Sequence, residues 1–325
     1  MIQNTVRNFF GFFLSLNNLE KKTLFKVVVG SSQGHIDIYH LDKFLVKTIQ
    51  THHNEAIIRA KPILNNQFAT VSDNGSFTIW NTTDWSASIV FNNDGRIYDI
   101  EYLGNYELAM ADLRSIQFIS MHTKKLSKKF ILNSQILCLK LLPNGHLASG
   151  DTDNQIKIWN YKNSSKPVVT MNGHQHFILD LELICEHRLA SASNDATVVI
   201  WDLLAFKKIF TLKGHLRGVS ILRYMPAHYL LASGSLDGSI SVWNVTNGEH
   251  RYKLLHGDNK TGSIFWSLDY MKDEKVLVSG SKNGIIKYWN FQSTIPFMMQ
   301  AIETKYEILA LSVLKRGNKC LKISY

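Results

Sequence analysis

The 325-residue sequence is poor in cysteine and in charge and has no long apolar run, and each shortage excludes a class of protein. Three cysteines, an odd number spread over the chain, do not form a disulfide framework, which favours an intracellular compartment, the cytoplasm or the nucleus. No window of about 18 apolar residues predicts a membrane span. Charged residues make up 19% and hydrophobic residues 45%, which excludes a disordered tail or a charge-rich coiled coil.

Sequence features that would indicate an enzyme of α/β type are also missing. No apolar pattern of helical period extends over about 10 residues between the expected strands. No glycine-rich phosphate loop precedes a helix. We therefore expect an all-β chain with almost no helix and no enzymatic activity.

One segment recurs along the chain. The tryptophan near its end, or the residue in that place, lies 39 to 46 residues from the corresponding residue of the next copy. Four copies, given at the end of this paragraph, are strong. A fifth copy, FATVSDNGSFTIWN, covers 68 to 81, and two weaker copies cover 27 to 39 and 108 to 120. The seven copies predict seven units that occupy nearly the whole chain. The four strongest copies are LASGDTDNQIKIWN (147 to 160), LASASNDATVVIWD (189 to 202), LASGSLDGSISVWN (231 to 244) and LVSGSKNGIIKYWN (277 to 290).

Each unit has the pattern of four short strands separated by turns. A Gly-His pair at the start of a unit, as at Gly214 and His215, and a Trp-Asp or Trp-Asn pair after the third strand are typical of propeller blades. In these features the sequence resembles the WD40 repeat family. The resemblance implies a seven-bladed WD40 β-propeller with four-stranded antiparallel blades, forming a single domain over residues 1–325.

The resemblance also implies a tetrad of buried polar side chains in each complete blade. Its members are the histidine of Gly-His, a serine or threonine of the second strand, the aspartate of the following tight turn and the tryptophan of the third strand. The indole N–H only donates and the carboxylate only accepts, so the four groups can satisfy one another. We expect these tetrads to be structural. The matching residues are His174, Ser191, Asp195 and Trp201 in one unit and His215, Ser233, Asp237 and Trp243 in the next.

Other units carry incomplete tetrads. Ser149, Asp153 and Trp159 match the pattern but lack a Gly-His upstream. The units that end at Trp80 and Trp289 have asparagine at the aspartate position. The first and third units have lost nearly all tetrad members, and we expect them to be the less rigid blades.

Serine, histidine and aspartate in one set also suggest a catalytic triad. A nucleophile needs exposure and a pocket, whereas this set repeats in neighbouring units at a position that joins strand ends. His174 and His176 have no cysteine or carboxylate cluster at ligand spacing, so they do not predict a metal site. The sequence therefore predicts no catalytic residue, no metal and no cofactor.

The charge balance favours an acidic partner. Lysine and arginine number 36 against 26 acidic residues, which gives a formal charge of +10 and a pI of about 9.3. Such a balance suits RNA, a phospholipid surface or an acidic protein segment. Lysines that follow the third strand of their units, among them Lys124, Lys125, Lys128 and Lys129, are expected on the circumference. There they either discourage edge-to-edge aggregation or form a footprint for nucleic acid.

The loops that carry the Gly-His and aspartate positions are expected on one face of the ring, where WD40 proteins commonly bind partners. The mixed composition of this face suits a protein or peptide better than a nucleic acid. The expected function is a non-catalytic scaffold for protein–protein interaction and complex assembly, present as a monomeric ring within a larger complex. The alternative is an RNA- or ribonucleoprotein-associated propeller that uses the basic rim. The candidate partner-binding positions are Asp73, Thr152, His176, Asn194, Arg217, Leu236 and Lys282.

Segments at both ends of the chain have the pattern of the first and second strands of a unit. FFLSL (12 to 16) and LFKVVVG (24 to 30) fit strands one and two of the first unit, whereas EILALSVL (307 to 314) and CLKISY (320 to 325) fit strands one and two of another. Residues 304–325 are therefore either an incomplete eighth repeat or an extra strand pair on the ring edge, with exchange against the N-terminal strands left open. The extra pair is preferred because a short sheet tolerates an added edge better than a propeller tolerates half a blade.

Overall fold

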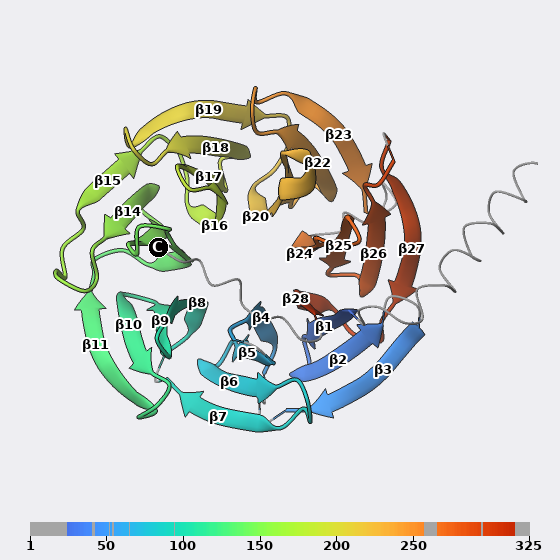
Figure 1. The fold of residues 1–325 in the computed structure, drawn as a ribbon, viewed down its shortest axis with the longest axis horizontal. Helices are drawn as coiled ribbons and strands as arrows, with labels where there is room; N and C mark the ends of the chain where they lie inside the picture. Colours follow the sequence, from blue (N-terminus) through green and yellow to red (C-terminus); the bar gives the residue numbers. More distant parts are fainter. Residues whose placement is uncertain are drawn as a thin grey trace, which may run out of the picture.

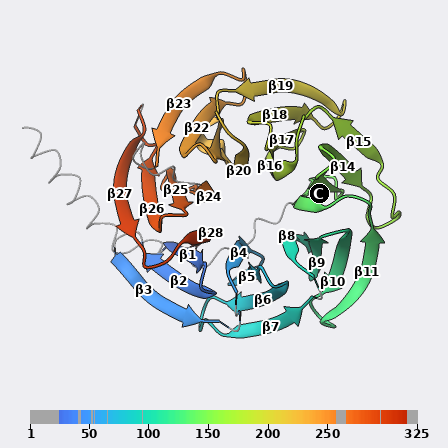
Figure 2. The same cartoon turned by 180° about the vertical axis from the view of Figure 1, so that it is seen from behind.

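The computed structural model describes residues 25–40, 43–51, 53, 55–64, 66–93, 95–256, 265–293 and 295–315. In these ranges the chain forms 28 β-strands and one short 3-10 helix, η1 (Pro226–His228). The strands form seven four-stranded antiparallel sheets, arranged as blades around one axis (Figure 1; Figure 2 from behind). The prediction of a seven-bladed propeller with four-stranded antiparallel blades is confirmed. No helix in the described ranges is long and apolar enough to cross a membrane.

The blades are numbered 1 to 7 around the ring, and the strands of each blade follow one another from the axis outward. Blade 1 is β28 (Ile308–Lys315), β1 (Phe25–Ser31), β2 (His35–His40) and β3 (Lys43–Gln50). Blade 2 is β4 (Ile57–Pro62), β5 (Gln67–Ser72), β6 (Ser76–Asn81) and β7 (Ala87–Asn92). Blade 3 is β8 (Ile97–Gly104), β9 (Glu107–Asp112), β10 (Ser115–Ser120) and β11 (Lys125–Ile131). Blade 4 is β12 (Ile136–Leu141), β13 (Leu147–Asp151), β14 (Gln155–Trp159) and β15 (Val169–Asn172).

The remaining three blades follow the same order. Blade 5 is β16 (Ile178–Cys185), β17 (Arg188–Ser193), β18 (Thr197–Asp202) and β19 (Lys207–Lys213). Blade 6 is β20 (Val219–Met225), β21 (Leu230–Ser235), β22 (Ser239–Asn244) and β23 (His250–Leu255). Blade 7 is β24 (Phe265–Met271), β25 (Val276–Ser281), β26 (Ile285–Asn290) and β27 (Phe297–Glu303).

The inner strands are buried on both faces because each blade packs between two neighbours. In blade 5, all of β17 after its first residue is buried, and so are the four central residues of β18. Ile178 and Val199 of this blade share a core cluster with Ile158 and Met171 of blade 4. A strand that loses water on both faces needs apolar side chains or small polar ones that are hydrogen-bonded. The VVIW segment of β18 is an apolar run, and in the LASAS segment of β17 the buried Ser191 and Ser193 are hydrogen-bonded. The outermost strand, β19, lies on the rim and is mostly exposed or half-buried.

The last described strand of the chain closes the ring. β28 pairs with β1 in antiparallel register, with Val27 opposite Val313 and Val29 opposite Leu311. It occupies the innermost position of blade 1, beside the N-terminal strands in Figure 1. The preferred interpretation of residues 307–314 as an extra edge is therefore wrong, and β28 does not begin an eighth blade either. The segments 12–16 and 320–325 lie outside the described residues.

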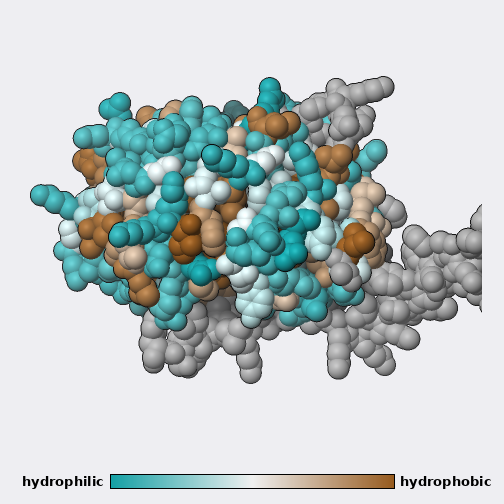
Figure 3. All heavy atoms as spheres, turned by 90° about the horizontal axis from the view of Figure 1, so that it is seen from above, coloured by the Kyte–Doolittle hydropathy of each residue, from teal (hydrophilic) through white to brown (hydrophobic). Residues whose placement is uncertain are grey.

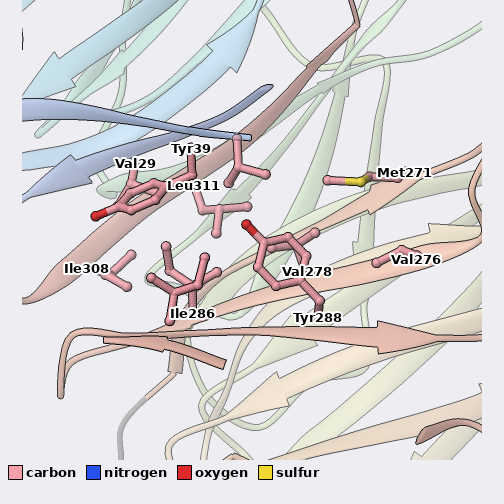
Figure 4. Packing of buried hydrophobic residues seen from close by; sticks show 11 residues of the cluster. Val29, Tyr39, Met271, Val276, Val278, Ile286, Tyr288, Ile308 and Leu311 are labelled. Carbon is pink, nitrogen blue, oxygen red and sulfur yellow. The ribbon is translucent and has the colours of Figure 1, made fainter. Parts of the chain in front are cut away.

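The contact between blade 1 and blade 7 is an apolar cluster, shown from close by in Figure 4. Val29 and Tyr39 from blade 1 and Leu311 from β28 pack with Ile286 and Tyr288 of blade 7, all of them almost fully buried. β28 thus contributes both backbone hydrogen bonds to β1 and side chains to the neighbouring blade. This double contribution is the physical reason why the strand belongs to the ring and not to its margin.

We expect deletion of residues 308–325 to abolish cooperative folding, because the deletion removes the innermost strand of blade 1 and exposes the β1 edge. Size-exclusion chromatography and thermal unfolding of the truncated protein test this expectation. A deletion of 316–325 keeps β28 and serves as the reference, so that the two truncated proteins differ by this strand alone. A folded, monomeric 1–307 fragment with an unchanged melting temperature would contradict the closing role of β28.

Candidate functional site

Blade 5 holds the four residues of its tetrad in one chain of hydrogen bonds. Trp201 Nε1 donates to Ser191 Oγ at 2.8 Å, and His174 Nε2 lies 2.7 Å from the same oxygen. His174 Nδ1 lies 2.9 Å from Asp195 Oδ2. The chain links the strands β17 and β18 to the loop that enters β16, so it ties the loop to the blade.

Blade 6 repeats the arrangement. Trp243 Nε1 donates to Ser233 Oγ at 2.7 Å, His215 Nε2 lies 2.8 Å from that oxygen, and His215 Nδ1 lies 3.2 Å from Asp237 Oδ2. A neutral imidazole with its proton on Nδ1 satisfies every partner, because Nδ1 then donates to the carboxylate while Nε2 accepts from the serine hydroxyl. The structure thus brings together the second full set of residues that the resemblance implied.

The tetrad aspartates also build the tight turns in which they lie. Asp195 accepts hydrogen bonds from the Thr197 hydroxyl at 2.6 Å and from the Gln175 N–H at 2.8 Å. Burial alone would raise the pKa of Asp195, but the hydrogen bonds from His174, Thr197 and Gln175 outweigh it and hold the pKa well below its usual range. The pKa of Asp237 is lowered in the same way. Both carboxylates are therefore ionised acceptors.

The serines of these tetrads are not placed as nucleophiles. Ser191 and Ser233 are 0% exposed, and each hydroxyl is already engaged by a tryptophan and a histidine. A nucleophile must be reached by a substrate and needs room for a tetrahedral intermediate. The geometry therefore fits a structural role, in which the tetrad holds the loop and the strands of one blade together, better than a catalytic role in acyl transfer.

Blade 4 differs from the expectation at Asp153. Trp159 Nε1 donates to Ser149 Oγ at 2.9 Å, but Asp153 is exposed and contributes only its backbone N–H to Asp151. The fully buried Asp151 instead lies 2.5 Å from Lys157 Nζ, with Ser134 Oγ 3.1 Å away. A lysine–aspartate pair thus replaces the histidine–aspartate pair, because no histidine is present to fill the space.

Blades 2 and 7 carry other substitutes. In blade 2, His53 lies 3.0 Å from Thr70 Oγ1, which also accepts from Trp80, and 2.6 Å from Ser76 Oγ. Ser76 thus takes the place of the missing aspartate. In blade 7, the imidazole of His256 contacts a backbone carbonyl at 3.3 Å, and burial lowers its pKa to about 4. The imidazole is therefore neutral at physiological pH.

A belt of charged side chains near the axis joins neighbouring blades. Lys140 on β12 lies 2.8 Å from Glu182 on β16, and Arg223 on β20 lies 3.7 Å from the same carboxylate. Arg223 also lies 3.2 Å from Asp269 on β24, and Lys61 on β4 lies 3.3 Å from a glutamate on β8. We define the charged belt as Lys61, Glu101, Lys140, Glu182, Arg223 and Asp269.

Carboxylates of the belt also bind the backbone of the next blade. Glu182 accepts the N–H of Tyr224 at 3.1 Å, and Asp269 accepts that of Val313 at 2.7 Å. Burial alone would raise the pKa of Glu182, but Lys140 and Arg223 outweigh it and the pKa is lowered. The carboxylate is therefore ionised and paired, which is the condition under which a buried charge is tolerated.

The sequence interpretation missed this belt, although a signal for it exists. The six residues recur at the same place in the first strand of successive units, about one repeat apart, and their sign alternates from basic to acidic. The WD40 pattern is strongest in the second and third strands, and the first strands of the units are less alike in sequence.

The loop positions expected to bind partners lie on the tetrad side of the ring but differ in exposure. Arg217 and Lys282 are exposed, whereas the other positions are half-buried. Asp73 is paired with Arg96 at 2.5 Å, and Thr152 Oγ1 accepts a backbone N–H at 3.2 Å. Residues engaged in this way shape the loops, so the structure leaves Arg217 and Lys282 as the accessible charges of the set.

Apolar side chains on the same side were missed by the sequence interpretation. Leu216, in the loop between β19 and β20, is 82% exposed, and Ile131, at the end of β11, is also 82% exposed. Phe177 and Leu113 are 40% and 45% exposed in neighbouring loops. Leu113 and Leu216 have polar neighbours on both sides, whereas Ile131 and Phe177 stand at the ends of apolar strand segments, where the strand pattern does not distinguish an exposed residue from a buried one. We call Leu113, Ile131, Phe177 and Leu216 the apolar loop residues.

Comparison with protein families agrees with the geometry of the blades. The family model described as "WD domain, G-beta repeat" matches residues 124–160, 165–202, 206–244 and 250–290. These segments cover four successive repeats of the seven-bladed ring. The chain belongs to the WD40 repeat family. In the WD40 ring, blades 5 and 6 carry the complete tetrads and lie within the matched segments.

Curated relatives match this WD40 chain over parts of their length. The nuclear distribution protein nudF 1 of Talaromyces marneffei is 37% identical over 118 residues, which are 35% of this chain and 26% of the relative. The ribosome biogenesis protein WDR12 homolog of Anopheles gambiae is 24% identical over 152 residues, 44% of this chain and 35% of the relative. The E3 ubiquitin-protein ligase COP1 of Pisum sativum is 25% identical over 153 residues, 44% of this chain and 23% of the relative. The chain thus covers at most about a third of these relatives.

We expect His215→Ala and Asp237→Asn to destabilise the protein at pH 7 by about 1 to 3 kcal/mol, because each leaves a buried polar partner unsatisfied. Since the pKa of Asp237 is lowered by folding, its stabilisation is present above the unfolded pKa of about 4 and is lost as the pH falls further. The difference between wild type and Asp237→Asn should therefore begin to shrink as the pH falls through about 4 and continue to shrink as the pH approaches the much lower folded pKa.

Urea unfolding at several pH values measures this difference. Asp153→Asn is the matched control, because Asp153 is exposed and should leave stability within about 0.5 kcal/mol of wild type. Equal stability of wild type and Asp237→Asn at pH 7 would contradict the structural role of the tetrad.

The charged belt gives a second stability expectation. Glu182→Gln removes the negative charge that Lys140 and Arg223 share, and we expect a loss of about 2 kcal/mol in the free energy of unfolding, less than for a fully buried pair because the two cations are partly exposed. Glu186→Gln changes a carboxylate whose side chain is 75% exposed and should have little effect. Chemical denaturation of both variants checks the expectation, and equal losses in the two would refute it.

Proposed function

We propose that the protein is a non-catalytic interaction scaffold that binds a protein or peptide partner on the tetrad side of the ring. The observation that carries the proposal is the exposed apolar side chain of Leu216 next to the exposed Arg217, in the loop that enters blade 6. Leu216 is 82% exposed next to the tetrad histidine His215, whose own ring is buried. An exposed apolar side chain on a rigidly held loop loses water on binding without a large ordering cost, which favours protein recognition.

The tetrads support this use of the face. In blades 5 and 6 the histidine and aspartate fix the loop before the first strand and the turn after the second strand, so the loop tips have a defined position. Rigid elements that carry variable loops are the usual arrangement of binding surfaces. The relatives include a protein named as an E3 ubiquitin-protein ligase and one named as a ribosome biogenesis protein, and both names agree with assembly roles for WD40 rings.

The alternative, binding of RNA by the basic rim, has weaker support. Lysines do lie on the outermost strands, as β11 and β19 illustrate, but Lys128 donates to the backbone of Tyr161 at 2.6 Å and lies over the Phe130 ring. Lys129 lies 4.0 Å from Asp112. The rim seen from the side is mainly hydrophilic with small separate hydrophobic patches (Figure 3), as expected for edge strands protected against aggregation.

Partner capture distinguishes the two proposals. We expect Arg217→Glu with Lys282→Glu, and separately Leu216→Ser, to reduce recovery of the specific partner at least fivefold in affinity purification from the native cell. Neutralising Lys124 and Lys125 on the rim should leave recovery within twofold, because exposed rim charges are screened beyond about 8 Å at physiological salt. Lys128 is kept, because it contacts the neighbouring loop.

Nuclease treatment and a salt titration test for the result that would contradict the scaffold proposal. If the rim variant loses its partners, the loop variants keep theirs, and recovery falls after nuclease treatment, the RNA-associated alternative replaces the scaffold proposal. RNA binding would also weaken steeply with rising salt, and removal of phosphate-binding lysines would make that slope shallower.

A further inference from the structure

A pocket lies between blades 6 and 7 on the side of the ring opposite the tetrads. Its volume is about 420 Å³, and its walls include His228 after β20, Asn244 and Arg251 at the outer part of blade 6, and Phe291 and Gln292 after β26. These residues lie in or beside the connections between strands one and two and between strands three and four. In an antiparallel blade, those connections are at the end away from the tetrad loops.

The walls of the pocket offer donors and positive charge. None of the described residues that line it carries a carboxylate. His228 Nε2 is buried and has no hydrogen-bond partner among the described residues. The Arg251 side chain is 47% exposed, and its one carboxylate contact in the part of the chain that the structure describes, Glu249 at 3.5 Å, is itself 60% exposed and therefore weakly held. Lys275 lies close enough to His228 to assist burial in lowering the pKa of that imidazole.

Exposed apolar side chains stand directly before or after lining residues in the chain. Tyr229, between the lining residues His228 and Leu230, is 63% exposed. Ile295 and Phe297, on either side of the lining residue Pro296, are 73% and 45% exposed. Exposed apolar side chains of this size next in the chain to the walls of a donor-rich pocket favour a ligand that combines an apolar group with a negative charge.

We propose that this pocket binds a short segment of a protein partner in which a carboxylate side chain lies next to an aliphatic or aromatic one. The carboxylate binds Arg251 and accepts a hydrogen bond from His228, and the apolar side chain packs against Tyr229 and Ile295. An arginine–carboxylate contact supplies orientation, and the apolar contact supplies most of the buried area. The site goes beyond the proposed function, because it lies on the other side of the ring and permits two partners to bind at once.

The experiment uses the full chain and an array of labelled peptides. Each peptide places one carboxylate one to four positions from an aliphatic or aromatic residue, and each has a counterpart with the amide in place of the carboxylate. We expect a subset of the acidic peptides to bind wild type, and Arg251→Gln and Tyr229→Ser each to weaken this binding about tenfold. Lys253→Gln, the same charge change two residues further along β23, should alter it less than twofold.

Several outcomes would overturn the proposal. Equal binding of acid and amide peptides, equal binding by wild type and Arg251→Gln, or no binding of any acidic peptide at 1 mM would each do so. Phosphoserine counterparts distinguish a carboxylate site from a phosphate site, and preferential binding of the phosphopeptides would replace the carboxylate assignment. Thermal unfolding confirms that the variants are folded, and capture of the tetrad-side partner by Arg251→Gln should be unchanged. Loss of that capture together with peptide binding would indicate one shared site.

Discussion

Closure of the ring is the constraint on which the rest of this structure depends. A single blade has two apolar faces and cannot bury either of them alone, so each blade requires a neighbour on both sides. The ladder between β28 and β1 supplies the last neighbour by joining segments almost 290 residues apart in the chain. The apolar cluster of Val29, Tyr39, Leu311 and Tyr288 then becomes buried, and the stacking of all seven blades is continuous.

Two polar systems work at different radii of this ring. The tetrads of blades 5 and 6 lie within single blades and tie their loops to the second and third strands. The charged belt lies near the axis and ties the first strand of one blade to that of the next, through pairs such as Lys140 and Glu182. Because these two systems together with the apolar stacking hold the body of the ring, the loop tips on both sides are available for recognition.

Much of the fold follows from the repeats, since a 40-residue period with a serine and a tryptophan in fixed places specifies the blade and, multiplied by seven, the ring. The contacts between Ser149 and Trp159 and within the blade 5 and blade 6 sets lie where the pattern expects them. The identity of the first strand of blade 1 could not be predicted, because residues 12–16 and 307–314 have the same apolar character and only long-range pairing chooses between them.

The sequence also could not predict where one residue of a blade takes over the role of another. Asp151 and Asp153 are two residues apart, and the choice of Asp151 depends on the approach of Lys157 in three dimensions. Exposed apolar residues such as Leu216 and Ile131 were missed for a related reason: a pattern that identifies strands by their apolar residues carries no information on which loop residue remains in contact with water.

The charged belt has a consequence for the number of blades. Positive and negative charges can alternate around a closed ring without two like neighbours only when the number of positions is even. A ring of seven blades therefore cannot alternate completely. One position must be neutral, or two like charges must meet. The neutral position is Ser312, on β28, between Asp269 of blade 7 and the basic strand β4 of blade 2. The uncharged position of the belt thus lies on the strand that closes the ring. Docking of this strand depends on shape and backbone pairing and does not require a side chain of either charge.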